Sequence, residues 1–421
     1  MWHNSGMNTF TCVFLAALTL TTWLRVWLAR RQIRHVRQHR EQVPAAFVEQ
    51  ISPAQHRLAA DYTVAKSRLS LVQIALETIV LSGFTVLGGV AWLARFWDQR
   101  IHGSITANVI LIASVIVLSG VTELPLDWYR KFRLEQRFGF NTMTLTRFVG
   151  DLSMQSAIGL VLGLPLLYAV FWILQAAGTY WWLYAWLVWV GFNLLILAIY
   201  PNFIAPLFNR FEPLPDGELK RHIAELLQKC GFASQGLFVM DGSKRSRHGN
   251  AYFTGFGKSK RIVLFDTLIK HLQTGEIEAV LAHELGHFHH RHVIKRMLWV
   301  FGMSLVFLAV IAELLHSTWF FSAFGVHSMS AGAGFALFFL VLPVFTLPLQ
   351  MLSGMYSRRH EFEADQYAAR FSDPELLVSA LIKLYRDNAT TLTPDHIYSM
   401  FYDSHPNAQQ RVARLTASVH N

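Results

Sequence analysis

Charged residues are scarce in this 421-residue sequence. Asp, Glu, Lys and Arg together make up 15% of the chain. In soluble proteins the same four residues make up roughly a quarter. Hydrophobic residues reach 53% and aromatic residues 14%. This composition excludes an ordinary soluble protein, and we expect a membrane protein.

Cysteine is scarce as well, with Cys12 and Cys230 far apart in the chain. Neither lies in a CxxC pair, which excludes a disulfide framework and a thiolate zinc site, and we expect both to be reduced. The sequence also has no internal repeat, no low-complexity linker and no glycine loop of the kind that binds phosphates or dinucleotides.

Acidic residues are outnumbered by basic ones, 27 to 37, which gives a formal net charge of +10. Proteins that bind nucleic acid also carry an excess of positive charge, but it forms a stripe on a soluble domain. Here Lys and Arg cluster beside apolar segments. We therefore interpret them as signals of membrane topology and expect no nucleic-acid partner.

Seven apolar runs are long enough to span a membrane. They cover about residues 10–29, 69–94, 105–123, 155–174, 180–200, 297–315 and 332–356. Arginines follow the first run directly, whereas a signal peptide carries its positive charge before its apolar core. The first run is therefore expected to be an uncleaved span with the N-terminus outside.

The segments between the runs differ in charge. Segments 30–68 and 124–154 hold eight and five Lys or Arg residues, whereas segments 175–179 and 316–331 hold none. Because basic loops stay in the cytoplasm, we expect the first two segments on the cytoplasmic side, together with both segments that carry the chemistry described below.

Five polar residues fall within the runs, where polar groups are costly. They are Arg25, Glu77, Asn108, Asn193 and Glu313. Two interpretations remain open. Either these residues line an internal chamber, or they form isolated hydrogen bonds between helices and extend toward the membrane surface.

Residues 283–287 read His-Glu-Leu-Gly-His. Histidines four apart project from one face of a helix, so His283 and His287 can bind one metal ion, with Glu284 beside the open coordination position. Zinc held by three protein ligands lowers the pKa of a bound water, and a neighbouring carboxylate can take its proton. We predict a zinc hydrolase with Glu284 as general base, on a helix capped by Thr274.

The third ligand must come from elsewhere, because Val293 stands where a metzincin has its third histidine. Glu361 and Asp365 share a helical face just past the last run, so Glu361 can bind the metal while Asp365 orients a ligand histidine through its second ring nitrogen. Glu363 points away and is expected to be solvated. Three further histidines are expected to be interfacial residues rather than ligands: His289, His290 and His292.

The stretch before the HELGH helix predicts a small sheet. Gly236–Met240 and Arg261–Phe265 are typical of short strands, with residues 251–256 between them and a turn at 257–260. We therefore expect an all-α polytopic membrane protein with a small α+β zinc metalloprotease domain. Its expected parts are a membrane region at 1–200, a first catalytic part at 201–296, two membrane helices at 297–356 and a second catalytic part at 357–421.

Several motifs point to one family. Residues 361–365 read Glu-Phe-Glu-Ala-Asp, and further matches stand at 203–209, 242–246, 250–253 and 260–268. This pattern resembles the type I CaaX prenyl proteases, which are membrane-embedded gluzincin peptidases, and the resemblance extends over almost the whole chain. It implies a zinc endopeptidase whose seven transmembrane helices surround an intramembrane chamber, with the catalytic site on the cytoplasmic side.

The resemblance also implies roles for individual residues. Glu284 is the catalytic base, His405 matches the position that stabilises the transition state, and Arg411 matches a position that supports the metal site. Three residues match the ligands of a single zinc ion: His283, His287 and Glu361. The substrate backbone is expected to bind along one segment: Asn250, Ala251, Tyr252 and Phe253.

The expected partners are a peptide or protein substrate, prenylated or otherwise hydrophobic, and the surrounding membrane lipid. The sequence ends Ser418–Asn421 with no endoplasmic-reticulum retrieval signal, so we expect a bacterial inner-membrane member. The alternative function is a membrane quality-control or pore factor that clears stalled or misfolded chains, with proteolysis secondary. A site-two-type intramembrane protease does not fit, because the HELGH stretch precedes Lys295 and Arg296 at a membrane boundary.

Overall fold

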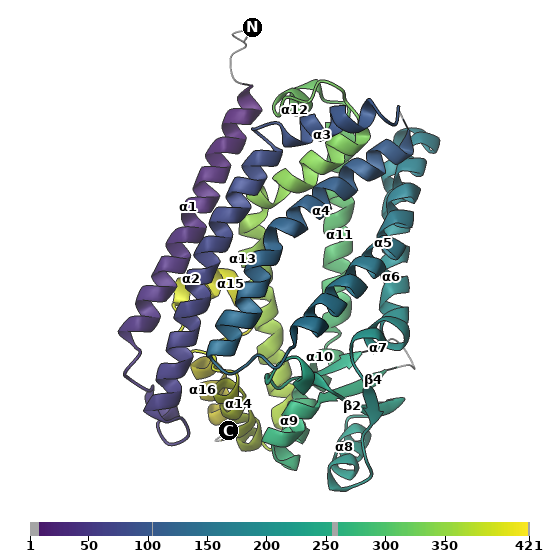
Figure 1. Ribbon diagram of the computed structural model, residues 1–421. Coiled ribbons are helices and arrows are strands. Elements are labelled where there is room, and N and C mark those ends of the chain that lie inside the picture. The colour runs from purple at the N-terminus through teal and green to yellow at the C-terminus, as the bar shows by residue number, and fades with distance from the viewer. Residues whose placement is uncertain (1–7, 103, 255–259, 420–421) are drawn as a thin grey trace.

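Long helices form most of the structure (Figure 1). In the computed structural model, which describes residues 8–102, 104–254 and 260–419, six helical segments are long and apolar enough to cross a membrane. They contain α1 (Thr9–Gln38), α4 (Ile105–Tyr129), α5 (Leu145–Ala176), α6 (Trp181–Ile199), α11 (His292–Leu314) and α13 (Ala331–Phe371). The expected polytopic membrane fold is confirmed.

A seventh span is present only if a bent pair of helices is counted as one. α2 (Pro53–Phe84) and α3 (Gly89–Asp98) qualify as a span only as a pair, and they meet at an angle of 47°. Gly88 between them has a φ of +79°, which favours glycine, and a Cβ at Gly89 would lie 2.7 Å from the carbonyl oxygen of Gly83. The second apolar run, predicted as one helix, therefore forms two.

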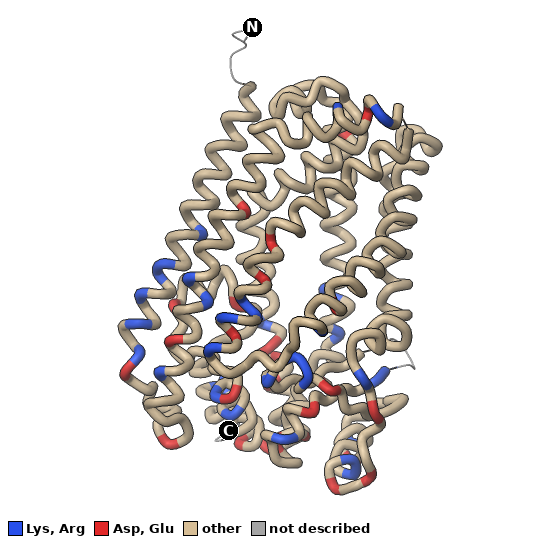
Figure 2. Tube along the Cα trace, in the orientation of Figure 1, with Lys and Arg blue, Asp and Glu red and all other residues tan. Residues whose placement is uncertain are grey.

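The outer faces of the spans are apolar. Large side chains on them are exposed, for example Leu20 at 63% and Val161 at 70%. In a bilayer such side chains contact lipid tails, so their exposure fits membrane spans. Figure 2 shows the charged residues gathered mostly toward one end of the molecule, around α8 (Glu218–Lys229), α14 (Pro374–Asp387) and α16 (Ala408–Val419).

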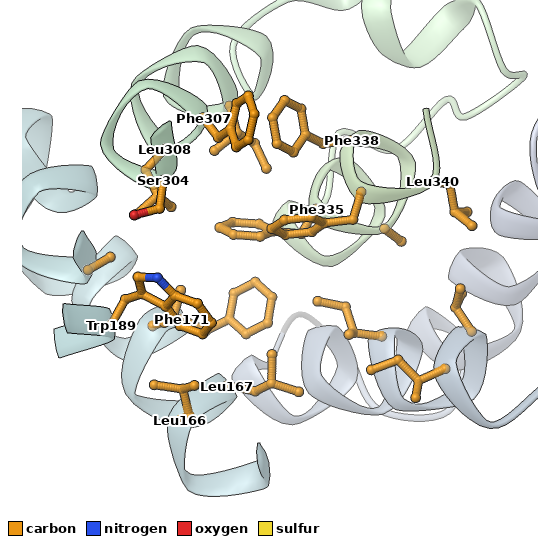
Figure 3. Close-up of a pocket in the computed structure, with 18 of the residues that line it drawn as sticks. Leu166, Leu167, Phe171, Trp189, Ser304, Phe307, Leu308, Phe335, Phe338 and Leu340 are labelled. Carbon is orange, nitrogen blue, oxygen red and sulfur yellow. The ribbon is translucent and has the colours of Figure 1, made fainter. Parts of the chain in front are cut away.

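A cavity of about 910 Å³ lies between α4, α5, α6, α11 and α13. Figure 3 shows its apolar wall, which includes Leu167, Phe171, Phe307, Phe335 and Phe338. It lies among the membrane helices, where a chamber was expected, but five helices rather than seven line it and none of the predicted site residues does. None of the five polar residues singled out in the spans lines it.

Four of those five polar residues bond within or between helices instead: Arg25, Glu77, Asn108 and Asn193. Arg25 forms an ion pair with Glu77 over 2.7 Å, which joins α1 to α2. Asn108 Oδ1 accepts a hydrogen bond from the backbone N–H of Gly332 at 2.7 Å, and Asn193 donates to a carbonyl of its own helix. Of the two open interpretations, bonding between helices is therefore correct for Arg25, Glu77 and Asn108.

A four-stranded sheet lies at the charged end of the molecule. It contains β1 (Phe211–Pro213), β2 (Gly236–Met240), β3 (Ala251–Thr254) and β4 (Arg261–Phe265), in the order β1-β2-β4-β3. β2 and β4 are parallel, and the outer strands pair antiparallel, so β3 is an edge strand. β2 and β4 begin and end where predicted. The last two residues of the predicted segment between them and most of the predicted turn, 255–259, lie outside the described residues.

One apolar core joins two distant parts of the sequence. Ile223 of α8, Ile262 of β4 and Leu281 of α10 (Thr274–His289) share it with Leu381 of α14. The shorter helices are α7 (Ala205–Phe208), α9 (Asp266–His271), α12 (Thr318–Ser322) and α15 (His396–Tyr402). Because this core includes residues before α11 and after the membrane part of α13, the chain enters the membrane region after the first part and returns to the core for the second.

The helix α13 is continuous from the membrane region into this core. It has 41 residues, which corresponds to roughly 60 Å of helix. The same helix therefore lines the cavity through Phe335 and carries Glu361 near its other end.

Candidate metal centre and active site

The helix α10, which carries the HELGH stretch, begins in a capping box. The backbone N–H of Gln273 donates to Glu276 Oε2 over 2.8 Å, so the predicted cap, Thr274, is wrong by one residue. Glu276 also accepts from Ser379 and Lys383 of α14, at 2.7 and 2.8 Å. Burial raises the pKa of Glu276, but the Lys383 ammonium lowers it, and the net direction is down. This buried anchor fixes α10 on α14.

α10 and α13 approach most closely beside Gly286, the glycine of the HELGH stretch. A Cβ at this position would lie 2.9 Å from the Cα of Ala364 and 3.0 Å from its carbonyl oxygen. A glycine facing an alanine lets the two backbones come this close. The approach brings Glu361 of α13 against the histidines of α10.

Three side chains from these two helices converge on one point. The ligand atoms of His283, His287 and Glu361 all lie within 4.8 Å of one another. His283 Nε2 is 3.5 Å and His287 Nε2 is 3.4 Å from the Glu361 carboxylate, and the two Nε2 atoms are 3.3 Å apart. Two imidazoles and a carboxylate are a donor set that suits a zinc hydrolase, which leaves a fourth position open.

Glu361 provides a further test of the fit to a metal ion. Its Oε2 atom is buried and has no hydrogen-bond partner among the described residues. His405 Nδ1 lies 2.8 Å from this atom, but without the alignment of a hydrogen bond. A buried carboxylate oxygen without a hydrogen bond is costly, and a cation at the point of convergence would satisfy it.

His283 is held by a buried ion pair. Its Nδ1 atom lies 2.8 Å from Asp365 Oδ1, and Arg411 binds both Asp365 oxygens, at 2.6 and 2.9 Å. Burial lowers the pKa of His283, but Asp365 and Glu361 raise it, to about 9. Since these carboxylates favour a positive charge on the ring, they also favour a metal cation, which would take the place of that proton.

Glu284 follows His283 on α10. Its side chain is half-buried and forms no ion pair with any residue in the described ranges. A carboxylate in this state is free to accept a proton. Its role as the base stays a prediction.

His405 and Arg411 reach the site from the segment after α15. The imidazole of His405 is exposed, and Arg411, which is buried, lies with its NH1 atom 3.8 Å from Glu361 Oε2. Both predicted residues are thus next to the third ligand. His405 faces the solvent, whereas Arg411 is buried.

The predicted substrate segment forms the edge strand β3. Asn250 is exposed just before it, and its Oδ1 accepts from the N–H of Ala251 at 2.9 Å. Phe253 packs on Phe288 of α10, with ring centroids 5.2 Å apart. Tyr252 packs on Phe265 of β4, with ring centroids 6.1 Å apart. β3 pairs with β4 along one edge, and within the described ranges no strand pairs with its other edge.

Two expectations about neighbouring residues are wrong. His292 is 4% exposed and hydrogen-bonds to His287, so it is a buried partner of a ligand rather than an interfacial residue. Glu363 accepts from His292 and from Arg359 rather than facing solvent alone. The signal in the sequence was weak, because His292 begins α11, after a change of chain direction at Arg291, which has a φ of +55°. Helical spacing from His287 does not predict contacts across such a break.

Comparisons with known proteins cover nearly the whole chain. Residues 32–210 match the family model described as CAAX prenyl protease N-terminal, five membrane helices, and residues 213–419 match Peptidase family M48. A CAAX prenyl protease 1 homolog of Dictyostelium discoideum is 37% identical over 389 residues, 90% of each chain. The corresponding homolog of Arabidopsis thaliana is 34% identical, over 89% of this chain and 90% of the relative.

A solved structure is similar over the same extent. The crystal structure of S. mikatae Ste24p matches with a TM-score of 0.89 and 29% identity, over 97% of this chain and 99% of that chain. The CAAX prenyl protease 1 of Saccharomyces cerevisiae is 32% identical, over 89% of this chain and 88% of that protein. The HELGH stretch and the convergent carboxylate of α13 both lie inside the matched peptidase region. The chain therefore belongs to peptidase family M48, together with the CAAX prenyl proteases, and is a membrane-embedded metalloendopeptidase.

Proposed function

We propose that the metal is a single zinc ion, held by His283, His287 and Glu361. The observation that carries this proposal is the convergence of two imidazoles and one carboxylate within 4.8 Å, with a buried carboxylate oxygen that accepts no hydrogen bond from the described residues. When bound, zinc would polarise the peptide carbonyl and acidify a water molecule. Residues 201–296 and 357–421 would then act as one catalytic unit, since they share the core described above.

The proton transfers belong to the residues of the chain. Glu284 would accept the proton of the attacking water and deliver it to the departing amine. His405, exposed beside Glu361, is available to donate a hydrogen bond to the carbonyl oxygen as negative charge develops there. Arg411 would act indirectly, by holding the Asp365 carboxylate against His283.

A Glu284→Gln substitution tests this proposal. We expect the variant to keep its metal, because no ligand changes, and to lose peptidase activity by about 10²–10⁴-fold, because general-base catalysis is gone. Metal content and cleavage of a reporter peptide would be measured on the purified protein in detergent. Glu278→Gln is the matched control, since Glu278 lies on the same helix but contacts His222 on α8. Near wild-type cleavage by Glu284→Gln would refute this choice of base.

The substrate is a peptide or protein, and we propose that it adds to β3 as an extra strand. An edge strand offers backbone donors and acceptors to any extended peptide, so sequence preference would be loose. The apolar cavity falls within the range of about 300–1,000 Å³ of known ligand pockets and suits a prenyl group or another hydrophobic segment. Lining residue Trp299 lies on α11, the helix that follows the HELGH helix.

Matched peptides with and without a farnesyl group test this model of binding. We expect both to be cleaved, and an Asn250→Ala substitution to weaken both, because Asn250 stands at the open edge where the backbone would bind. Cleavage rates over a range of peptide concentrations would separate binding from chemistry. Strict dependence on the lipid would indicate a dedicated CaaX protease, and an unaffected Asn250→Ala variant would count against strand addition.

We also propose that the catalytic unit faces the cytoplasm and that the N-terminus lies outside. The start of α1 and the sheet are at opposite ends of the molecule (Figure 1), and most Lys and Arg residues lie toward the end with the sheet (Figure 2). Impermeant reagents should label a tag at the N-terminus but not one within residues 30–68. Labelling of the tag within residues 30–68, but not of the N-terminal tag, would reverse this assignment. The bacterial inner membrane stays a prediction, since the relatives named above are eukaryotic.

A further inference from the structure

The second histidine of the HELGH stretch has its own chain of contacts. His287 Nδ1 lies 3.0 Å from His292 Nδ1, and His292 Nε2 lies 3.0 Å from Glu363 Oε2. The other oxygen of Glu363 accepts from Arg359 Nε at 3.0 Å. Side chains from α10, α11 and α13 therefore form a continuous line that ends at a metal ligand.

The chemistry of these atoms determines where each proton lies. An ionised carboxylate only accepts hydrogen bonds, so His292 must carry its proton on Nε2 to donate to Glu363. His292 Nδ1 is then an acceptor, and His287 must carry its proton on Nδ1. The lone pair of His287 is left on Nε2, the atom that faces His283 and Glu361. Glu363 thereby selects the tautomer of His287 that can bind a metal.

The packing around His292 keeps this line in place. His292 is 4% exposed, and its ring stacks on that of His360, with centroids 3.8 Å apart and an angle of 10° between the planes. Tyr356 packs edge-on against His360 at 4.1 Å. A ring held between neighbours in this way cannot turn freely, so the direction of its two nitrogen atoms is fixed.

A second metal site at these residues fits the geometry less well. The ligand atoms of His292, His360 and Glu363 lie within 4.8 Å of one another, which is close enough for an ion. However, two parallel rings 3.8 Å apart direct their in-plane lone pairs side by side rather than toward a common point. His292 would also have to give up its bond to Glu363 or to His287.

We propose that His292 and Glu363 are positioning residues that hold His287 in its metal-binding tautomer and orientation. This inference rests on the proposed function, in which His287 is a ligand. It gives the two ligand histidines separate supports, Asp365 for His283 and the His292–Glu363 pair for His287. Loss of such an outer partner typically weakens metal binding by about 10–100-fold.

Metal release from the full-length protein tests the proposal without relying on activity. Zinc-loaded protein in detergent would be mixed with a chromogenic chelator, and the release rate measured. We expect His292→Leu, which keeps the volume but cannot accept, to release zinc about 10–100-fold faster than wild type. His292→Asn, whose Oδ1 can replace the Nδ1 acceptor, should recover part of the difference. His289→Ala is the control, because His289 is exposed and packs on Tyr367 instead.

Three outcomes separate the possible failures. Wild-type release by His292→Leu, with metal lost in His287→Ala, would overturn the positioning role and leave the proposed function intact. Full metal retention in His287→Ala would instead overturn the proposed ligand set. Two metal ions per chain, one of them lost in His292→Leu, would assign His292 to a second site and reject the proposal. If His292→Leu fails to fold, Glu363→Ala tests the same line from a side chain that is only partly buried, and wild-type zinc release by this variant would overturn the proposal.

Discussion

The two histidines of the metal centre are supported in different ways. His283 is buried and contacts Asp365, whose carboxylate is bound at both oxygens by the buried Arg411. His287 is half-buried and contacts a neutral ring, with its carboxylate one residue further away. An ion pair in a dry site is costly to break, whereas an exposed pair contributes little. The comparison indicates that the His283 side supports the fold as well as the metal, and the His287 side mainly the metal.

The largest contrast is expected between two carboxylates on the same helix. Glu361→Ala removes a ligand and should abolish stoichiometric metal binding, whereas Glu363→Ala removes only a partner of His292 and should weaken it by about 10–100-fold. Metal analysis after gel filtration, with and without added chelator, distinguishes the two. Equal retention in both variants would move the third ligand elsewhere.

Asp365→Asn should have the next largest effect, and on stability as well as metal binding. It leaves the Arg411 guanidinium buried without its carboxylate, which typically costs about 3–5 kcal/mol. Thermal unfolding in detergent, followed by tryptophan fluorescence, would show a lower midpoint than wild type in the metal-free protein. Glu363→Gln is the matched variant and should leave that midpoint nearly unchanged. Equal unfolding midpoints in the two variants would mean that the contacts of His283 and those of His287 contribute equally to stability.

The dependence of metal binding on pH provides a finer test. His283 has a pKa raised to about 9, so the metal must displace a proton below that pH. Apparent affinity should therefore rise by about tenfold per pH unit between roughly pH 6.5 and 9. In the metal-free protein the same raised pKa contributes stability that is fully present below about pH 6.5 and lost as the pH rises through 9.

Substitutions of the two carboxylates should change this slope differently. Asp365→Asn removes the main group that raises the pKa of His283, so the slope should flatten. Glu363→Gln leaves Asp365 and Glu361 in place and should keep it. Competition with a chelator of known affinity at several pH values measures both. An unchanged slope in Asp365→Asn would mean that the pH dependence of metal affinity does not come from His283.

The smallest effect is expected at Arg359, which pairs with Glu363 at the exposed end of the contacts that support His287. The Arg359 side chain is 77% exposed, and its pair with Glu363 is worth about 0–1 kcal/mol at most. Arg359→Ala should therefore change metal release by no more than a few fold, while Arg411→Ala, at the corresponding place in the buried support, should release metal and lower the unfolding midpoint. A large effect of Arg359→Ala on release would mean that the exposed pair is essential to the line of contacts.

Much of the membrane architecture could be predicted because hydropathy is a local property. Six of the seven apolar runs correspond to helices that can cross a membrane, and the remaining run, 69–94, corresponds to a bent pair of helices. The bend was not predicted, because Gly88 and Gly89 are ordinary residues of an apolar run until the chain packs Gly89 against Gly83. The helix cap was misplaced by one residue because Thr274 is a common cap, whereas Gln273 serves here through its pairing with Glu276.

The contacts of the site also divide into those that the sequence predicts and those that depend on the packing of helices. The sequence by itself determined that His283 and His287 share one face of a helix and that Glu361 and Asp365 share another, because the period of a helix fixes side-chain directions within it. Only the tertiary structure decided which carboxylate supports which histidine. That choice depends on how closely α10 and α13 approach at Gly286, and on the turn after α10 that returns His292 to His287. Both features bring separate helices into contact, and no local pattern in the sequence encodes such contacts.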